Sequence, residues 1–198
     1  MMRTAALARS AVFVVAAAMA SLAHAQQKPA TEPAPTPLPP EYTEEARRSY
    51  AAGLVEARKL LDAKRYDEAI ARLDELGRSR PREAQARFMK AVAQADSGRS
   101  DDALDTLRGL TTDFPELPEP RNNLAVLYAA QGNYALARQE LELAITAAPD
   151  YAVAHENLGD VYVRLAALSY ERAAALDKTN KAAPQKLKLA RDLITSSR

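Results

Sequence analysis

The sequence predicts an all-α protein built from stacked helical hairpins, that is, an α-solenoid, and three observations support this fold class. Glycine is scarce, with 6 residues in 198, and long β-branched runs are missing, so sheets are disfavoured. Apolar residues follow the spacing of 3 and 4 that is typical of helices. Identical residues also recur every 34 positions in three ladders, which are Pro81, Pro115 and Pro149, then Ala69, Ala103 and Ala137, and finally Leu73, Leu107 and Leu141. A period of this length indicates stacked supersecondary units.

The first 25 residues are expected to be a signal peptide. Arg3 and Arg9 supply the positive start, residues 10–22 form an uncharged and mostly apolar stretch, and Ala23 and Ala25 fit the small-x-small rule for cleavage after Ala25. The alternative is an uncleaved anchor, although a membrane span needs about 20 apolar residues. The chain has no cysteine, which excludes a lipidated cysteine and disulfides. We therefore expect a periplasmic or secreted protein with no integral membrane span after cleavage.

Residues 26–40 (QQKPATEPAPTPLPP) are expected to form a disordered linker. Six of these residues are prolines, which cannot donate backbone hydrogen bonds. Such a segment favours an extended, semi-rigid spacer between the signal peptide and the folded domain, which we place at residues 41–198.

The third repeat unit shows the layout of one hairpin most clearly. Residues 122–128 (NNLAVLY) carry a helical apolar stripe, and residues 131–133 (QGN) interrupt it. Gly132 can adopt the left-handed conformation that ends a helix. Residues 134–147 (YALARQELELAITA) then resume helical spacing until Pro149 stops them. The corresponding turns of the first two units are residues 63–65 and 97–99.

These residues resemble the tetratricopeptide repeat family, whose pattern is W-x2-L-G-x2-Y, then A-x3-F, then P. The third unit matches it with Leu124, Ala125, Tyr128, Ala137, Leu141 and Pro149, whereas Glu56 and Lys90 replace the pattern's leucine in the first two units. We place the repeats at residues 50–83, 84–117 and 118–151, with a degenerate one at 152–180. The resemblance implies a right-handed solenoid that acts as a protein-binding scaffold.

The fourth unit lacks its turn. In phase, its second-helix alanine should stand at position 171, which is Glu171, but the matching signature begins five residues earlier at Ala166 and continues through Tyr170 and Ala173. No glycine or proline occurs between positions 160 and 183. We therefore expect one fused helix from about Ala152 to Asp177, which would end the solenoid.

Two flanking helices complete the expected domain. One runs from Glu41 to Asp62 and can be capped by Thr43. The other spans Pro184 to Thr195, with proline at its first position, and is expected to act as a capping helix over the exposed end.

No residue pattern indicates catalysis, so the sequence predicts a non-enzymatic protein without cofactor or metal. His155 is the only histidine after residue 25, and we expect it to pack on a helix where the family has tryptophan. Without cysteine, the usual Cys and His metal sites are excluded. The formal net charge of +1 also argues against nucleic acid as a partner.

The inner wall of the solenoid, formed by the first helix of each unit, is the expected place for a protein or peptide partner. Asn123 and Asn157 occupy matching places, where they either bond a bound peptide's backbone or bridge neighbouring helices. The same apolar residues could instead pack first helices together. The candidate partner-binding residues are Phe88, Val92, Asn122, Asn123, Val126, Ala130, Asn157, Asp160 and Arg164.

The sequence thus favours an exported, non-enzymatic scaffold that captures a partner peptide or protein in its concave groove. Two alternatives stay open. One is an assembly module of a cell-envelope complex that self-associates, at least weakly, through its groove or end. The more distant one is an accessory to a cell-wall enzyme.

Overall fold

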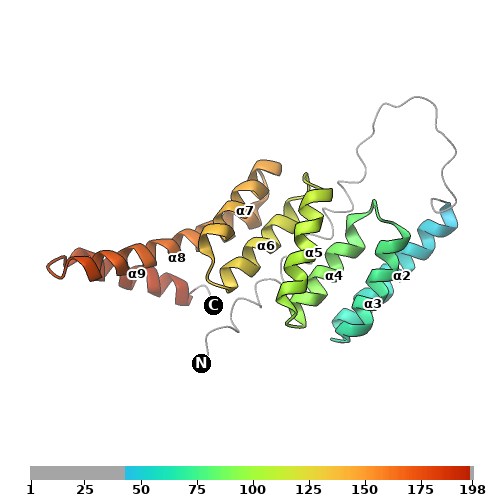
Figure 1. Cartoon of the computed structure of the whole chain (residues 1–198), viewed down its shortest axis with the longest axis horizontal. Coiled ribbons are helices and arrows are strands. Elements are labelled where there is room, and N and C mark those ends of the chain that lie inside the picture. Colours follow the sequence, from blue (N-terminus) through green and yellow to red (C-terminus); the bar gives the residue numbers. More distant parts are fainter. Residues whose placement is uncertain (1–42, 197–198) are drawn as a thin grey trace.

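The computed structural model describes residues 43–196, and within this range the chain forms eight helices and no strand (Figure 1). The all-α prediction is therefore confirmed. The expected signal peptide and linker lie outside the described residues. The helices are α2 (Glu44–Asp62), α3 (Tyr66–Ser79), α4 (Ala84–Asp96), α5 (Ser100–Asp113), α6 (Pro118–Ala130), α7 (Tyr134–Ala147), α8 (Ala152–Leu176) and α9 (Ala182–Ser196).

Three helical hairpins form the body of the domain, and they follow one another along its long axis (Figure 1). Their turns centre on Lys64, Gly98 and Gly132, with φ values of 58°, 83° and 80°. This left-handed conformation is unstrained for glycine, whereas a residue with a Cβ usually costs about 1 kcal/mol there. The predicted turns are therefore confirmed, although the first one uses a lysine.

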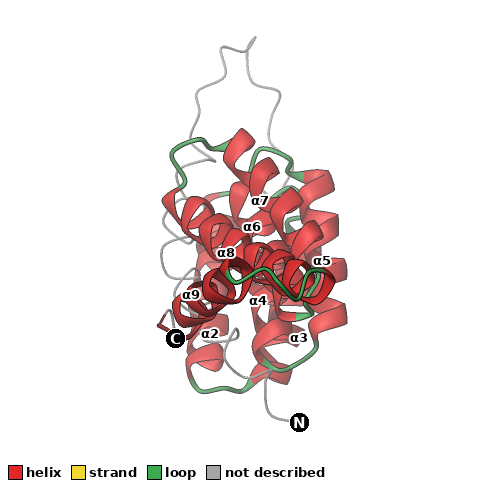
Figure 2. Ribbon diagram, turned by 90° about the vertical axis from the view of Figure 1, so that its left-hand side faces the viewer, coloured by secondary structure: helices red, strands yellow, loops and turns green. Residues whose placement is uncertain are grey.

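The hairpins stack into two layers, which can be followed when the molecule is viewed along the stack (Figure 2). Each second helix packs on its own first helix and on the first helix of the next unit, as in the contacts of α3 with α2 and α4. Alanine and leucine fill these contacts, and the second helix of the third unit buries Ala137, Leu141 and Ala144 completely. The alanine and leucine ladders are thus core positions, whereas Pro81, Pro115 and Pro149 lie exposed at the ends of the second helices.

The fourth unit is a single helix of 25 residues, α8, as the missing turn predicts. Its first half packs on α7 and α6, and Ala154 and Val161 are buried there. Its second half extends past α7 (Figure 1). No residue in the expected turn region breaks the backbone hydrogen-bond pattern, so the helix continues to Leu176.

The last helix, α9, packs on α8 and forms a two-helix arm with its second half (Figure 1). An ion pair of 3.1 Å between Arg191 and Glu171 joins the two helices. The helix begins at Ala182, two residues before the predicted start, because Asn180 Oδ1 accepts hydrogen bonds of 3.0 Å from the backbone N–H groups of Ala182 and Ala183. Pro184 is tolerated in this first turn, where its missing N–H is not needed.

The first helix begins later than predicted, at Glu44. Thr43 is the cap that the sequence suggested, since its hydroxyl accepts a hydrogen bond of 3.2 Å from the backbone N–H of Ala46. Glu41 lies outside the described residues. None of the helices within residues 43–196 combines the length and hydropathy that a membrane crossing requires.

Candidate functional site

The predicted partner-binding residues fall into rows, because equivalent positions of α4, α6 and α8 lie 34 residues apart. The row that contains Phe88 and Asn122 points into the interior, and both side chains are completely buried. Phe88 therefore packs in the core beneath the inner wall and is not accessible to a partner. Two other rows reach the surface of the wall. One contains Val126 and Asp160, and the other contains Ala130 and Arg164.

Two neighbouring hollows mark this wall, and we call them together the inner groove. One lies between α4 and α6 and is lined by Ala91, Val92, Ala95, Asp96, Leu107, Asn123, Val126 and Leu127. The other lies between α6 and α8 and is lined by Ala125, Val126, Ala129, Leu141, Asn157, Asp160, Val161 and Arg164. Val126 belongs to both hollows. Six of the nine predicted residues therefore line the groove, while Phe88, Asn122 and Ala130 do not.

The asparagines of the groove form a chain of hydrogen bonds across two helices. Asn157 Nδ2 on α8 donates to Asn122 Oδ1 on α6 at 2.8 Å. Asn122 Nδ2 in turn donates to Asn123 Oδ1 at 3.4 Å, a weak contact. Of the two roles that the sequence left open, the bridge between neighbouring helices is therefore present for Asn157, whereas Asn123 contacts its neighbour on α6. Asn157 stays partly exposed, so its remaining amide capacity is accessible from the groove.

Charged groups of both signs border the apolar hollows. The guanidinium of Arg164 lies 5.9 Å from the centre of the Tyr134 ring, a cation–π contact that fixes its position at the edge of the groove. Asp160 is exposed one turn before it. At the other hollow, desolvation by neighbouring side chains raises the pKa of Asp96, although the residue as a whole is exposed.

At the start of α6 lies a buried acid that the sequence reading did not recognise. Glu119, the second residue of α6, is 1% exposed, and its Oε2 has no hydrogen-bond partner among the described residues. Burial raises the pKa of Glu119, and a hydrogen bond from its own backbone N–H offsets this only in part. The only sequence signal was its position between Pro118 and Pro120, and an acid in a first turn normally faces solvent.

The hydroxyl of Tyr151 is a second buried polar group in this region. It has no hydrogen-bond partner among the described residues. Burial, reinforced by the negative charge of Glu119, raises the pKa of Tyr151. The interior near the start of α6 thus holds two polar groups without a hydrogen-bond partner among the described residues.

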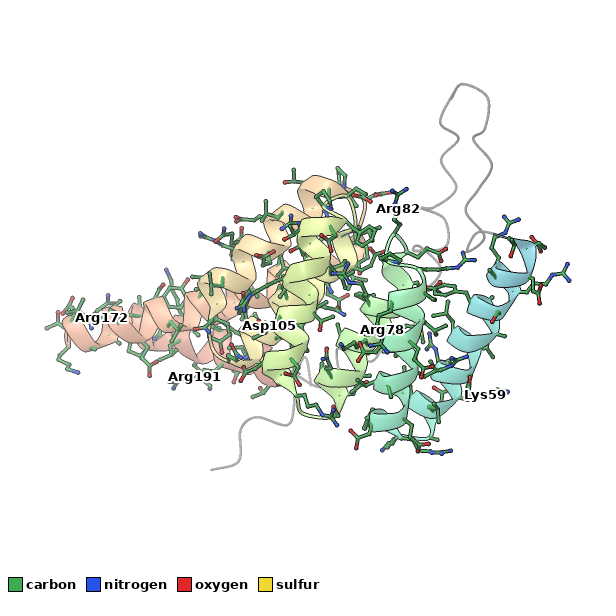
Figure 3. The ribbon with its side chains drawn as sticks, turned by 45° about the vertical axis from the view of Figure 1, so that its right-hand side comes forward. Lys59, Arg78, Arg82, Asp105, Arg172 and Arg191 are labelled. Atoms are coloured by element: carbon green, nitrogen blue, oxygen red, sulfur yellow. The ribbon has the colours of Figure 1, made fainter. Side chains whose placement is uncertain are left out.

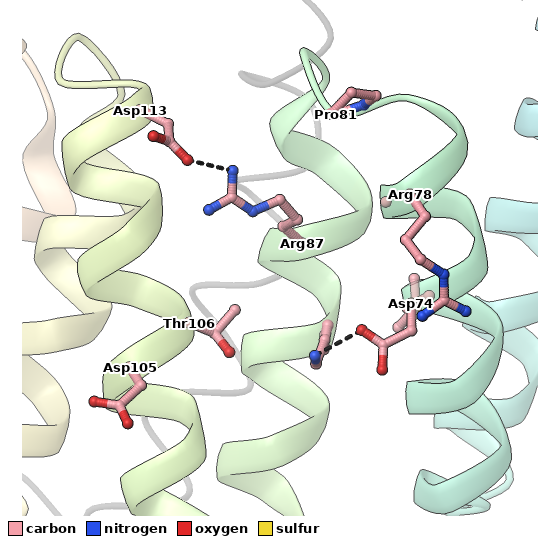
Figure 4. A pocket seen from close by; sticks show the side chains of 10 residues that line it. Asp74, Arg78, Pro81, Arg87, Asp105, Thr106 and Asp113 are labelled. Atoms are coloured by element: carbon pink, nitrogen blue, oxygen red, sulfur yellow. Dashed lines mark hydrogen bonds and ion pairs between the residues drawn. The ribbon is translucent and has the colours of Figure 1, made fainter.

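A larger cleft, of about 610 Å³, lies on the other side of the second unit, and we call it the outer cleft. It runs between α3 and α5 above α4, and Asp105 and Arg78 stand on its opposite walls (Figures 3 and 4). Its charged groups are largely paired, since Lys90 Nζ contacts Asp74 Oδ1 at 2.6 Å and Arg87 Nη1 contacts Asp113 Oδ2 at 2.6 Å. These pairs tie α4 to both of its neighbours.

The outer cleft is explained by one departure from the repeat pattern. Lys90 stands where the third unit has Leu124, which is 1% exposed and fills the equivalent space. A lysine cannot be buried in this way, so it turns to Asp74 and leaves the space open. Because its charges are satisfied within the protein, the outer cleft is a weaker candidate for a partner than the inner groove.

Histidine and acidic side chains form no catalytic constellation within residues 43–196. His155 is exposed and not packed as predicted, and its Nε2 lies 2.9 Å from the carbonyl oxygen of Pro149. The first turn of α8 has no further helix to cover this position. Within the described part of the chain, no group of three or more histidine, aspartate or glutamate side chains is placed to hold a metal ion.

The stacked hairpins and the groove on their first helices define a helical-repeat scaffold. The sequence model of the family described as "Tetratricopeptide repeat" matches residues 54–118 and again residues 95–152. The chain belongs to the tetratricopeptide repeat family, whose members typically act as non-enzymatic scaffolds for protein–protein interactions. No curated protein sequence matches the chain significantly.

Proposed function

We propose that this chain is an exported scaffold that captures a peptide segment of another protein in its inner groove. The observation that carries the proposal is the pair of hollows on either side of Val126. They lie on adjacent first helices, they are lined mainly by apolar side chains, and acidic and basic groups border them. The hollows are shallow, with volumes of about 40 and 20 Å³, so an extended or helical peptide would lay two small apolar side chains against them as anchors.

The geometry suggests the spacing of these anchors. Packed helices lie about 8–10 Å apart, so the two hollows are separated by roughly that distance. An extended peptide covers about 10 Å in three residues, and an α-helix covers it in about seven. Asp96 and Asp160, one beside each hollow, favour a partner with a basic residue near an anchor.

A displayed peptide library tests this proposal. Peptides selected on the full chain are expected to carry two apolar residues at one of these spacings, and Val126→Glu is expected to abolish their binding because it places a charge in both hollows. The matched control is Leu136→Glu on α7, since Leu136 is exposed and lines neither hollow. Selected peptides that bind Val126→Glu as well as the unchanged chain would place the site elsewhere.

Export rests on the first 25 residues of the sequence and is tested separately. Mass spectrometry of the protein from its native cells is expected to find Gln26 at the N-terminus. An intact Met1 in the membrane fraction would favour the uncleaved anchor. The partner of an exported scaffold would be met outside the cytoplasm, so a cross-linked pull-down should start from that compartment.

A further inference from the structure

The fused helix α8 leaves a helix-binding face uncovered on its first half. In the third unit, Leu124, Ala125 and Tyr128 of α6 are covered by α7 and are 1%, 1% and 8% exposed. The equivalent residues of α8, one period later, are Leu158, Gly159 and Tyr162. Tyr162 is 48% exposed, Gly159 is exposed and Leu158 is only partly buried. The site that a second helix fills in the earlier units is present here without its helix.

The second half of α8 carries the sequence signature of the second helix that the fourth unit lacks. Ala166, Tyr170 and Ala173 repeat the signature of Ala137, Leu141 and Ala144, which are completely buried against α6. On α8, however, all three equivalents are only partly buried. Within one chain, this face cannot reach the first half of α8, because the helix is continuous.

Both faces lie on the same side of α8. Positions 159, 162, 166, 170 and 173 follow one another at spacings of 3 and 4, which keeps residues on one side of a helix. Two copies of α8 lying antiparallel would therefore bring each second half onto the first half of the other copy. This arrangement is the antiparallel packing of the two helices in each hairpin of the chain, formed between two molecules.

We propose that the protein forms a symmetric dimer in which the second half of α8 occupies the uncovered face of α8 in a second copy. The arrangement is self-complementary, as a two-fold interface requires. The hairpin of α6 and α7 also gives the register in which the two copies of α8 would pair. Arg121 and Glu140 join α6 and α7 at 3.2 Å, and their equivalents on α8 are positions 155 and 169. Position 162 lies midway between them, so Tyr162 stands near the two-fold axis.

The last helix adds apolar surface beside the proposed interface between the two copies of α8. Leu189 and Leu193 of α9 are 65% and 58% exposed, and they share one side of α9 with Lys186. The Nζ of Lys186 lies 5.7 Å from the centre of the Tyr170 ring, and Tyr170 belongs to the proposed interface. This side of α9 therefore borders the interface. In the dimer, the two leucines would contact the partner copy and lose their exposure.

Cysteine cross-linking tests the proposal directly, because the natural chain has no cysteine. Under mild oxidation, full-length Tyr162→Cys is expected to form disulfide-linked dimers rapidly. The control is Val55→Cys, since Val55 is 57% exposed on α2 at the opposite end of the stack (Figure 1). Equal cross-linking of both variants, or none of Tyr162→Cys, would overturn the proposal.

Gly159→Gln separates assembly from folding. A Cβ at position 159 meets no atom within 4 Å in the single chain, so the fold has room for the new side chain. Glutamine is also a better helix former than glycine. In sedimentation equilibrium, the unchanged protein is expected at twice the chain mass and Gly159→Gln at the chain mass, with the same helical circular dichroism spectrum. A monomeric unchanged protein, or a dimeric Gly159→Gln, would contradict the proposed interface. Neither outcome bears on peptide capture in the inner groove.

Discussion

The buried acid at the start of α6, Glu119, gives the sharpest test of the energetics. We expect Glu119→Gln to stabilise the protein at neutral pH, because the glutamine keeps the shape of the side chain and removes its negative charge. Glu119 is 1% exposed, and its Oε2 lacks a partner among the described residues. A buried neutral group left unsatisfied costs about 1–3 kcal/mol, and a charged one costs more. The glutamine, which is unpaired at the same place, therefore recovers only the part due to the charge, on the order of 1–3 kcal/mol. For a domain of this size, that corresponds to a rise in Tm of roughly 3–9 °C.

The sign of the pH dependence follows from the raised pKa of Glu119. A carboxyl group whose pKa is higher in the folded state contributes stability that is fully present below its unfolded pKa and is lost as the pH rises through the folded pKa. At about pH 4, the natural protein and Glu119→Gln should therefore be almost equally stable. The advantage of the variant should appear as the pH rises towards 7 and then level off.

Urea denaturation followed by circular dichroism, repeated across this pH range, measures the effect. The matched control is Glu116→Gln, since Glu116 is an exposed residue just before α6 and its replacement should leave the stability nearly unchanged. A loss of stability at pH 7 for Glu119→Gln would refute the reasoning. It would mean that the positive end of α6 stabilises the carboxylate more than burial penalises it.

Three further predictions concern packing. Asn157→Ala is expected to cost about 1 kcal/mol or more, because it leaves the buried Asn122 carbonyl unpaired, and a double-mutant cycle of the two asparagines should show coupling in urea denaturation. Lys90→Leu should change stability by less than about 1.5 kcal/mol, whereas Leu124→Lys at the equivalent buried position should cost about 3 kcal/mol or more; equal effects would contradict our explanation of the outer cleft. Phe88→Ala should cost about 3–5 kcal/mol in the same assay, and a normal unfolding midpoint would show that its site collapses around the smaller residue.

The helices and turns could be predicted because each depends on local sequence or on the repeat period. The ladder positions fixed the phase of every hairpin, and the five-residue deficit was enough to predict the fused helix. The start of α9 was placed late because the capping side chain, Asn180, lies outside the helix that it stabilises. A search for caps upstream of Pro184 could have found it.

The groove was predictable only in part. A helical period separates the side of α6 that packs on α7 from the opposite side, but α6 also contacts α5 and α8. Which residues of the opposite side face these neighbours depends on how the hairpins are rotated in the stack. Phe88 and Asn122 lie between the side that faces the neighbouring helices and the side that forms the exposed wall. The sequence could not show to which of the two sides they belong. The burial of Glu119 was missed for the same reason.

The continuous α8 has a mechanical consequence. A helix of 25 residues is about 37 Å long at 1.5 Å per residue. Its first half carries Asn157, Asp160 and Arg164 of the inner groove, and its second half forms the arm with α9. Because the helix is continuous, its two halves move together. A displacement of the arm would therefore also move Asn157, Asp160 and Arg164 and would widen or narrow the groove available to a bound peptide.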